Sequence, residues 1–160
     1  MIDGFPGALT LAAAVGAGLM GGVFFAFSAF VMRALRSLPD GQGLTAMQAI
    51  NTAAPSPIFL AALLGTALAS AGLAVAAILR IDEPAAPYQL VGSALSLAGF
   101  ALTLGYHVPR NDSLGRVGPS TAGAGEAWRR YARGWTAWNH VRTATSVAAA
   151  VALVLALRVG

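Results

Sequence analysis

The sequence contains no cysteine and no lysine, and it has few charged side chains of any kind. The absence of cysteine excludes a disulfide framework and any metal site built on thiolates. Charged residues make up only 10% of the chain, whereas a typical soluble domain has roughly 25%. Hydrophobic residues make up 57% of its 160 residues. A soluble fold of this size would lack the polar side chains that must cover its surface, so the composition favours a single-domain membrane protein.

Four long segments contain no charged side chain, namely residues 9–32, 56–79, 88–106 and 143–157. A spanning helix needs about 20 apolar residues, and the last segment reaches this length if its helix begins near residue 136. Backbone groups in lipid must be paired internally, so each span should be helical. The sequence therefore predicts an all-α, integral membrane four-helix bundle. It forms one domain over residues 1–160, with spans at about 9–32, 56–79, 88–106 and 136–157.

The arginines are distributed unevenly between the two ends of such a bundle. Eight of the ten basic residues follow the first or the third span, and the other two lie at the opposite end. This bias predicts a multi-pass protein of the cell (plasma) membrane with both termini outside and two cytoplasmic loops. Short amphipathic helices are expected in these loops. The net charge of +4 and pI of 10.7 reflect arginines beside apolar runs, a pattern that favours membrane lipids as partners and not nucleic acid.

Small residues recur at spacings of four in the first three spans. Such stripes let helix backbones approach closely in lipid. They predict the packing faces of the bundle, and they are compatible with a homo-oligomer. The residues concerned are Ala14, Gly18 and Gly22, then Gly65 and Ala69, and then Gly92 and Ser96.

Polar side chains that could take part in chemistry are concentrated near the two predicted cytoplasmic loops. Gln48 and Asn51 lie three residues apart and share a helical face. His107 comes just before Pro109, which disfavours continuation of the helix and places His107 at a helix end. An imidazole there is either an interfacial side chain stabilised by the helix dipole or a general base.

The segment from Glu126 to Arg142 combines aromatic, amide and guanidinium side chains. At 100° per residue, one arc of a helix there holds Trp128, Tyr131, Trp135, Trp138, Asn139 and Arg142. Aromatic residues alone would be typical of a core or an interfacial belt. Arg142 either extends to lipid phosphate or turns inward to meet an anion. His140 lies on another face, with the remaining arginines of the segment.

Four motifs follow one another along the chain. They are Gly-Gly-Val-Phe-Phe-Ala-Phe-Ser at 21–28 with Val31-Met32, Met47-Gln48-x-Ile50-Asn51, His107-Val108-Pro109-x-Asn111, and Trp135-x-x-Trp138-Asn139-His140-x-Arg142-Thr143. Taken in order, they resemble those of the anthrone-oxygenase-like membrane protein family. The resemblance covers nearly the whole chain, and many bacterial members of the family have no known function. It implies a small four-helix membrane protein and, for fungal members, oxidation of an anthrone to an anthraquinone by O₂ without a recognised metal or flavin.

The implied reaction would need a base, hydrogen-bond donors for an enolate oxygen, and aromatic walls. His107 is the preferred base and His140 the reserve. Arg142 would stabilise the oxyanion, and neither a cofactor nor a metal is expected. The expected amide donors are Asn51, Asn111 and Asn139, with Gln48 as a further candidate, and the expected stacking residues are Trp135 and Trp138.

Two functions therefore remain open at the level of the sequence. The first is a cofactor-independent oxygenase that oxidises an anthrone-like polycyclic phenolic substrate to a quinone. The second is a non-catalytic membrane protein that binds a lipid, a quinone or a partner helix in the same region. An apolar aromatic small molecule is the expected ligand of the oxygenase, and a quinone bound without catalysis would be of the same kind. A closed polar pocket containing His107, Asn111 and Arg142 would favour catalysis.

Overall fold

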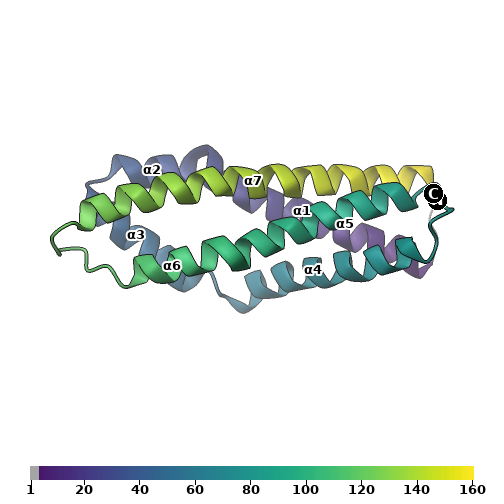
Figure 1. The fold of residues 1–160 in the computed structure, drawn as a ribbon, viewed down its shortest axis with the longest axis horizontal. Helices are drawn as coiled ribbons and strands as arrows, with labels where there is room; N and C mark the ends of the chain where they lie inside the picture. Colours follow the sequence, from purple (N-terminus) through teal and green to yellow (C-terminus); the bar gives the residue numbers. More distant parts are fainter. Residues whose placement is uncertain (1–3) are drawn as a thin grey trace.

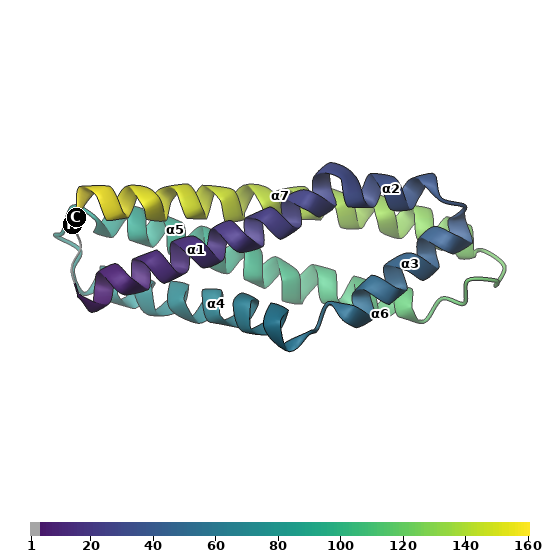
Figure 2. The same ribbon diagram turned by 180° about the vertical axis from the view of Figure 1, so that it is seen from behind.

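The computed structural model describes residues 4–160, and within this range the chain forms four antiparallel helical rods (Figures 1 and 2). In chain order the elements are α1 (Phe5–Ala26), η1 (Phe27–Val31), α2 (Met32–Ser37), α3 (Asp40–Ala53), α4 (Pro57–Ile78), α5 (Ala86–Leu102), η2 (Thr103–His107), α6 (Val108–Gly115) and α7 (Ala124–Val159). Here η1 and η2 are single π-helical turns, and α7 runs the full length of the molecule.

The predicted all-α fold with four membrane-spanning helices is confirmed. Four helical stretches are long and apolar enough to cross a membrane: Pro6–Ser37, Pro57–Ile78, Ala86–Gly115 and Ala124–Val159. The short helix expected in the first long loop is α3. In the second long loop the helical residues belong to α6 and to the first turns of α7, which continue the spanning rods beyond the predicted boundaries.

Proline and serine mark the start of several helices. Pro6, Pro57 and Pro87 each occupy a first-turn position, where the missing N–H would have had no partner within the helix. Ser56 also caps α4, because its hydroxyl accepts a hydrogen bond from the Phe59 N–H at 3.3 Å. The break between α3 and α4 is therefore encoded locally. It turns the chain at the point where the cavity described below opens.

Small residues mediate close helix packing at some of the predicted positions but not at others. A Cβ atom on Gly92 would lie 2.5 Å from Leu153 Cγ, so α5 and α7 approach closely there. A Cβ atom on Gly16 would likewise collide with the Thr66 side chain, so these two residues are also in close contact. By contrast, a Cβ on Gly18, Gly22 or Gly65 would meet no atom within 4 Å. The prediction was wrong for these three glycines, because their spacing identifies a helix face without showing which face meets a neighbour.

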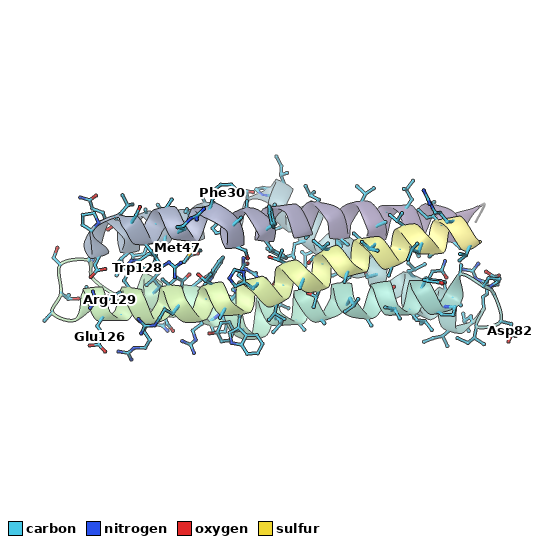
Figure 3. All side chains as sticks on the ribbon, turned by 90° about the horizontal axis from the view of Figure 1, so that it is seen from above. Phe30, Met47, Asp82, Glu126, Trp128 and Arg129 are labelled. Atoms are coloured by element: carbon cyan, nitrogen blue, oxygen red, sulfur yellow. The ribbon has the colours of Figure 1, made fainter. Side chains whose placement is uncertain are left out.

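A compact apolar core joins α2, α3, α6 and α7 at the loop end of the molecule. Trp128, Met32 and Met47 are among its largest fully buried members, and Figure 3 shows Met47 and Trp128 between the helices. An ion pair between Arg129 and Asp40 links the beginnings of α7 and α3. Asp82 lies at the opposite end of the molecule (Figure 3). This core fixes α3 as a cap beside the ends of the spanning helices.

The two π-helical turns lie in separate rods, next to the candidate site. In η1 the Met32 N–H bonds the Phe27 carbonyl, and in η2 the Val108 N–H bonds the Thr103 carbonyl, each five residues back. The expectation that the helix ends at Val108 was wrong. The wider turn η2 precedes Pro109, which then occupies the first turn of α6, where a proline needs no N–H partner. His107 therefore lies within a continuous rod.

Candidate functional site

A cavity of about 550 Å³ lies between α1, α3, α4, the α5–η2–α6 rod and α7. Most of its wall is aliphatic or aromatic, and Phe24, Phe27, Met47 and Phe59 are among the large side chains that line it. A few polar side chains interrupt this apolar wall. They are Asn51, Thr103, His107, Asn111 and Arg142, with Ser56 at the α3–α4 turn. A large apolar pocket with a few convergent polar groups is the usual form of a small-molecule site.

His107 lines this cavity, and one of its ring nitrogens has no hydrogen-bond partner among the described residues. Its side chain is 1% exposed, and its Nδ1 lies 3.2 Å from the Leu102 carbonyl oxygen. A carbonyl oxygen can only accept, so Nδ1 carries the hydrogen and donates. In the neutral ring Nε2 is then an unprotonated acceptor. It is buried and has no hydrogen-bond partner within residues 4–160. The π turn thus holds in the cavity wall an imidazole with one unpartnered ring nitrogen.

Arg142 places a buried cation in the same wall. The residue is 5% exposed, and its two terminal nitrogens donate to Thr103 Oγ1 at 3.2 Å and to Asn139 Oδ1 at 2.7 Å. Its Nε is buried without a partner, and no carboxylate within residues 4–160 pairs with it. The guanidinium carbon lies 4.1 Å from the centre of the Phe24 ring. Of the two sequence alternatives for this arginine, the structure shows the inward one.

Asn139 holds Arg142 in place. It is fully buried, and its amide nitrogen donates to the Phe24 carbonyl and to Ser28 Oγ, both at 2.8 Å. Its Oδ1 accepts from Arg142. Asn139 does not line the cavity, so its place is behind the guanidinium. It connects α7 to the junction of α1 and η1, and it acts as a positioning residue.

A chain of hydrogen bonds connects α3, α6 and α7 at the loop side of the cavity. The Tyr131 hydroxyl donates to Asn111 Oδ1 at 2.8 Å, and Trp135 Nε1 donates to the same oxygen at 3.0 Å. The Asn51 amide nitrogen lies 3.5 Å from the Tyr131 hydroxyl oxygen, to which it donates. With its Oδ1 occupied twice, Asn111 keeps its amide hydrogens for other partners. The Trp135 ring packs edge-on against His107, with ring centres 5.1 Å apart.

Three predicted ligand contacts lie outside this cavity. Gln48 instead donates to the carbonyls of Leu114 and Val117, both at 2.9 Å, and thereby ties α3 to the end of α6. Trp138 is 42% exposed, because it lies at the edge of the predicted arc. His140 is exposed, because it points away from the arc of α7 that faces the cavity. These three residues are therefore not contacts of a ligand held in the cavity.

The site also contains three residues for which the sequence predicted no role. Phe24 contacts the guanidinium, Thr103 accepts a hydrogen bond from it, and Tyr131 joins the two asparagines. Tyr131 already fell on the predicted arc, and a hydroxyl there was the available signal. Neither Phe24 nor Thr103 differs in type from its apolar or small surroundings, so the sequence offered no comparable signal. Within residues 4–160, no group of three or more His, Asp or Glu side chains comes together.

The fold and the site define a class of protein: an all-helical chain with four membrane-length helices around a buried, largely apolar ligand cavity. Residues 44–152 match the anthrone oxygenase family, and since this is more than half of the chain, the protein belongs to that family. No curated protein and no solved structure matches the chain. The matched region contains the polar site residues Asn51, Thr103, His107, Asn111, Tyr131, Asn139 and Arg142.

Proposed function

We propose that the protein is a membrane-embedded oxygenase that deprotonates an anthrone-like polycyclic phenol in this cavity and oxidises it with O₂ to a quinone. The observation that carries the proposal is the pairing of a free imidazole nitrogen on His107 with an uncompensated guanidinium on Arg142 in one apolar cavity. A base and an unpaired cation together favour a ligand that loses a proton and becomes an anion.

The chemistry suits such a ligand. The central CH₂ of an anthrone is acidic, because its anion is an aromatic enolate. Transfer of that proton to a base leaves an electron-rich anion. The anion gives one electron to O₂, and the resulting pair forms a carbon–oxygen bond. The resulting peroxide anion takes the first proton back from the base and becomes a hydroperoxide. The base then removes the second hydrogen of the same carbon as a proton while the distal hydroxide leaves, and that proton joins the hydroxide, which yields the quinone and one water. Anthrone and O₂ thus give anthraquinone and H₂O, with no other oxidant or reductant required.

The residues divide these tasks by their positions. His107 takes each proton at Nε2 and returns it, first to the peroxide anion and then to the departing hydroxide. Arg142 faces the enolate oxygen with N–H groups that its protein partners leave free, and the free amide hydrogens of Asn111 add a further donor. The rings of Phe27 and Trp135 contact each other and together form one aromatic wall beside the ligand. The apolar wall excludes water, which strengthens the interaction between the developing anion and the guanidinium.

The test uses the purified protein in lipid nanodiscs with emodin anthrone and O₂, followed by the absorbance of the quinone and by oxygen consumption. His107→Ala should lower the enzymatic rate by about 10²–10⁴, the usual contribution of a general base. His140→Ala is the matched control, because it removes an exposed imidazole from the same end of the bundle. Equal rates for the wild type and His107→Ala would refute the assignment of the base.

The second candidate function is binding without turnover, and the predominantly apolar wall of the cavity supports it. Such a protein would hold a lipid or a quinone against Trp135. The same experiment separates the two functions. Tight binding of emodin, without oxidation of the anthrone above the rate in empty nanodiscs, would establish the binding function and remove the oxygenase.

A further inference from the structure

The residues around the cavity differ sharply in exposure from one side to the other. On the inner side His107, Arg142 and Trp135 are at most 5% exposed. On the outer side the lining includes four aliphatic residues that are partly open to the surroundings. They are Leu60 at 38%, Leu64 at 48%, Leu104 at 52% and Val108 at 42%. The cavity therefore opens sideways, between α4 and the η2–α6 part of the neighbouring rod.

Both ends of the bundle close the cavity. Toward the loops, Gln48 ties α3 to the end of α6, and the apolar core around Trp128 fills the space between α3 and α7. Toward the opposite end, Met20, Phe24 and Leu63 pack together with Phe100. The hydrogen bond of 2.9 Å between Ser70 and Ser96 joins α4 to α5 beyond that cluster. A ligand cannot pass along the bundle axis without unpacking one of these contacts.

The mouth lies where α4 and its neighbour separate. Helices α4 and α5 pack together along much of their length, but η2 and α6 make no comparable contact with α4. The exposed side chains at the mouth are aliphatic and belong to stretches that could span a membrane. Lipid acyl chains are the solvent that such a surface fits. The α3–α4 turn, with Ala54 exposed, borders the mouth on the loop side and is the competing route from water.

We infer that the ligand reaches the buried His107 and Arg142 laterally, out of the lipid acyl chains, through the mouth formed by Leu60, Leu64, Leu104 and Val108. The ligand is accordingly a flat molecule that dissolves in the bilayer, and it leaves by the same route. This route into the cavity does not depend on whether the ligand is oxidised or only bound.

The first test needs no ligand. Two variants each retain one buried tryptophan: Trp128→Phe with Trp138→Phe retains Trp135, and Trp135→Phe with Trp138→Phe retains Trp128. Both are placed in bilayers of phosphatidylcholine brominated near the glycerol or midway along the chain. Trp135 and Trp128 are similarly buried, at 5% and 1% exposure, but only Trp135 lines the cavity. Bromine that enters the mouth should quench Trp135 strongly and leave Trp128 nearly unchanged.

The second test measures passage through the mouth. The chain lacks cysteine, so Leu104→Cys, Ala54→Cys and Leu68→Cys each create a single thiol that N-phenylmaleimide can cap. The quenching of tryptophan by emodin is then followed in time in proteoliposomes. Capping at Leu104→Cys should slow both binding and release by about tenfold or more, as a blocked gate does. Leu68→Cys is the matched control, because it is 73% exposed on α4 and outside the cavity lining.

The outcomes separate access from function. Equal quenching of Trp135 and Trp128 by brominated lipid would overturn lateral access. So would slowing at Ala54→Cys with none at Leu104→Cys, because the ligand would then enter from water at the α3–α4 turn. Strong quenching of Trp135 by lipid, with no binding of emodin, would support the lateral mouth and count against an anthrone-type ligand.

Discussion

Replacing Arg142 by methionine separates stability from ligand binding. Methionine is unbranched and adapts to irregular spaces, so it can follow the path of the arginine stem. The substitution removes a cation that is 5% exposed and has no carboxylate partner within residues 4–160. It also removes the contacts of the guanidinium with the rings of Phe24 and Trp135. The substitution should therefore change the free energy of unfolding and the free energy of ligand binding by different amounts.

The effect on stability is small because opposing contributions nearly cancel. Burying an ion costs several kcal/mol even after relaxation. The hydrogen bonds to Thr103 and Asn139 offset about 1.5–3 kcal/mol each, as bonds to a charged group do. The contact with the Phe24 ring adds about 0.5–2 kcal/mol. Arg142→Met should thus change the free energy of unfolding by less than about 2 kcal/mol, whereas breaking a buried ion pair costs about 3–5 kcal/mol.

The effect on an anionic ligand is larger. Loss of one charge-assisted hydrogen bond, worth about 1.5–3 kcal/mol, weakens binding by about ten- to a hundredfold. The assay compares emodin, at a pH at which it is a phenolate, with the neutral anthraquinone, using tryptophan quenching in nanodiscs. Arg142→Met should weaken the binding of emodin by this factor and leave the binding of anthraquinone nearly unchanged. Arg130→Met is the matched control, because Arg130 is exposed and pairs with Glu126.

Two results would refute this reasoning. An equal loss of affinity for emodin and anthraquinone would show that Arg142 shapes the cavity without interacting with charge. Unchanged binding of emodin would show that the guanidinium does not face the ligand. Reversible unfolding in mixed detergent micelles gives the stability of each variant, so that a folding defect is not mistaken for a loss of binding.

Three further predictions concern the bundle. Gly92→Ala should destabilise it by about 1–3 kcal/mol, because the new Cβ collides with the facing helix. Gly18→Ala, with open space around it, should be neutral or stabilising by up to about 1 kcal/mol. Equal unfolding curves for the two variants would contradict this prediction. Gln48→Leu should free α3 from α6 and speed amide exchange in α3 without changing the cavity lining, and unchanged exchange would count against it. In intact cells an impermeant maleimide should label Asp82→Cys but not Ser120→Cys, and the reverse pattern would invert the predicted orientation.

The sequence predicted the spanning helices well, because absence of charge is a cumulative property of many residues. Neither π turn was predicted, since the residues 27–31 and 103–107 carry no pattern distinct from an α-helix. Pro109 then led to the wrong expectation of a helix end, because a proline disfavours the helical conformation of the residue before it. The wider η2 turn accommodates the proline within the rod.

The candidate site was predictable in part. The helical arc on α7 identified several of its residues, but it did not show which of them face a neighbouring helix. Arg142 and Trp135 lie near the centre of that arc and are buried. Trp138 and Asn139 lie at its two edges, and only Asn139 is buried, because it packs against the junction of α1 and η1. The separate roles of Asn139 and Asn111 depend on which rods face each other, and periodicity on one helix contains no such information. Tyr131 shows the same limit, because its bonds reach α3 and α6.

The most direct test of the central claim is the absorbance spectrum of emodin anthrone bound to the protein without oxygen. His107 and Arg142 together should convert the neutral ligand into a bound enolate, so anaerobic titration should give the long-wavelength enolate band at one equivalent. His107→Ala should bind the ligand without this band, and His140→Ala should show it in full. If the wild-type protein binds the anthrone and the spectrum stays that of the neutral keto form, the proposed pairing of base and cation is contradicted.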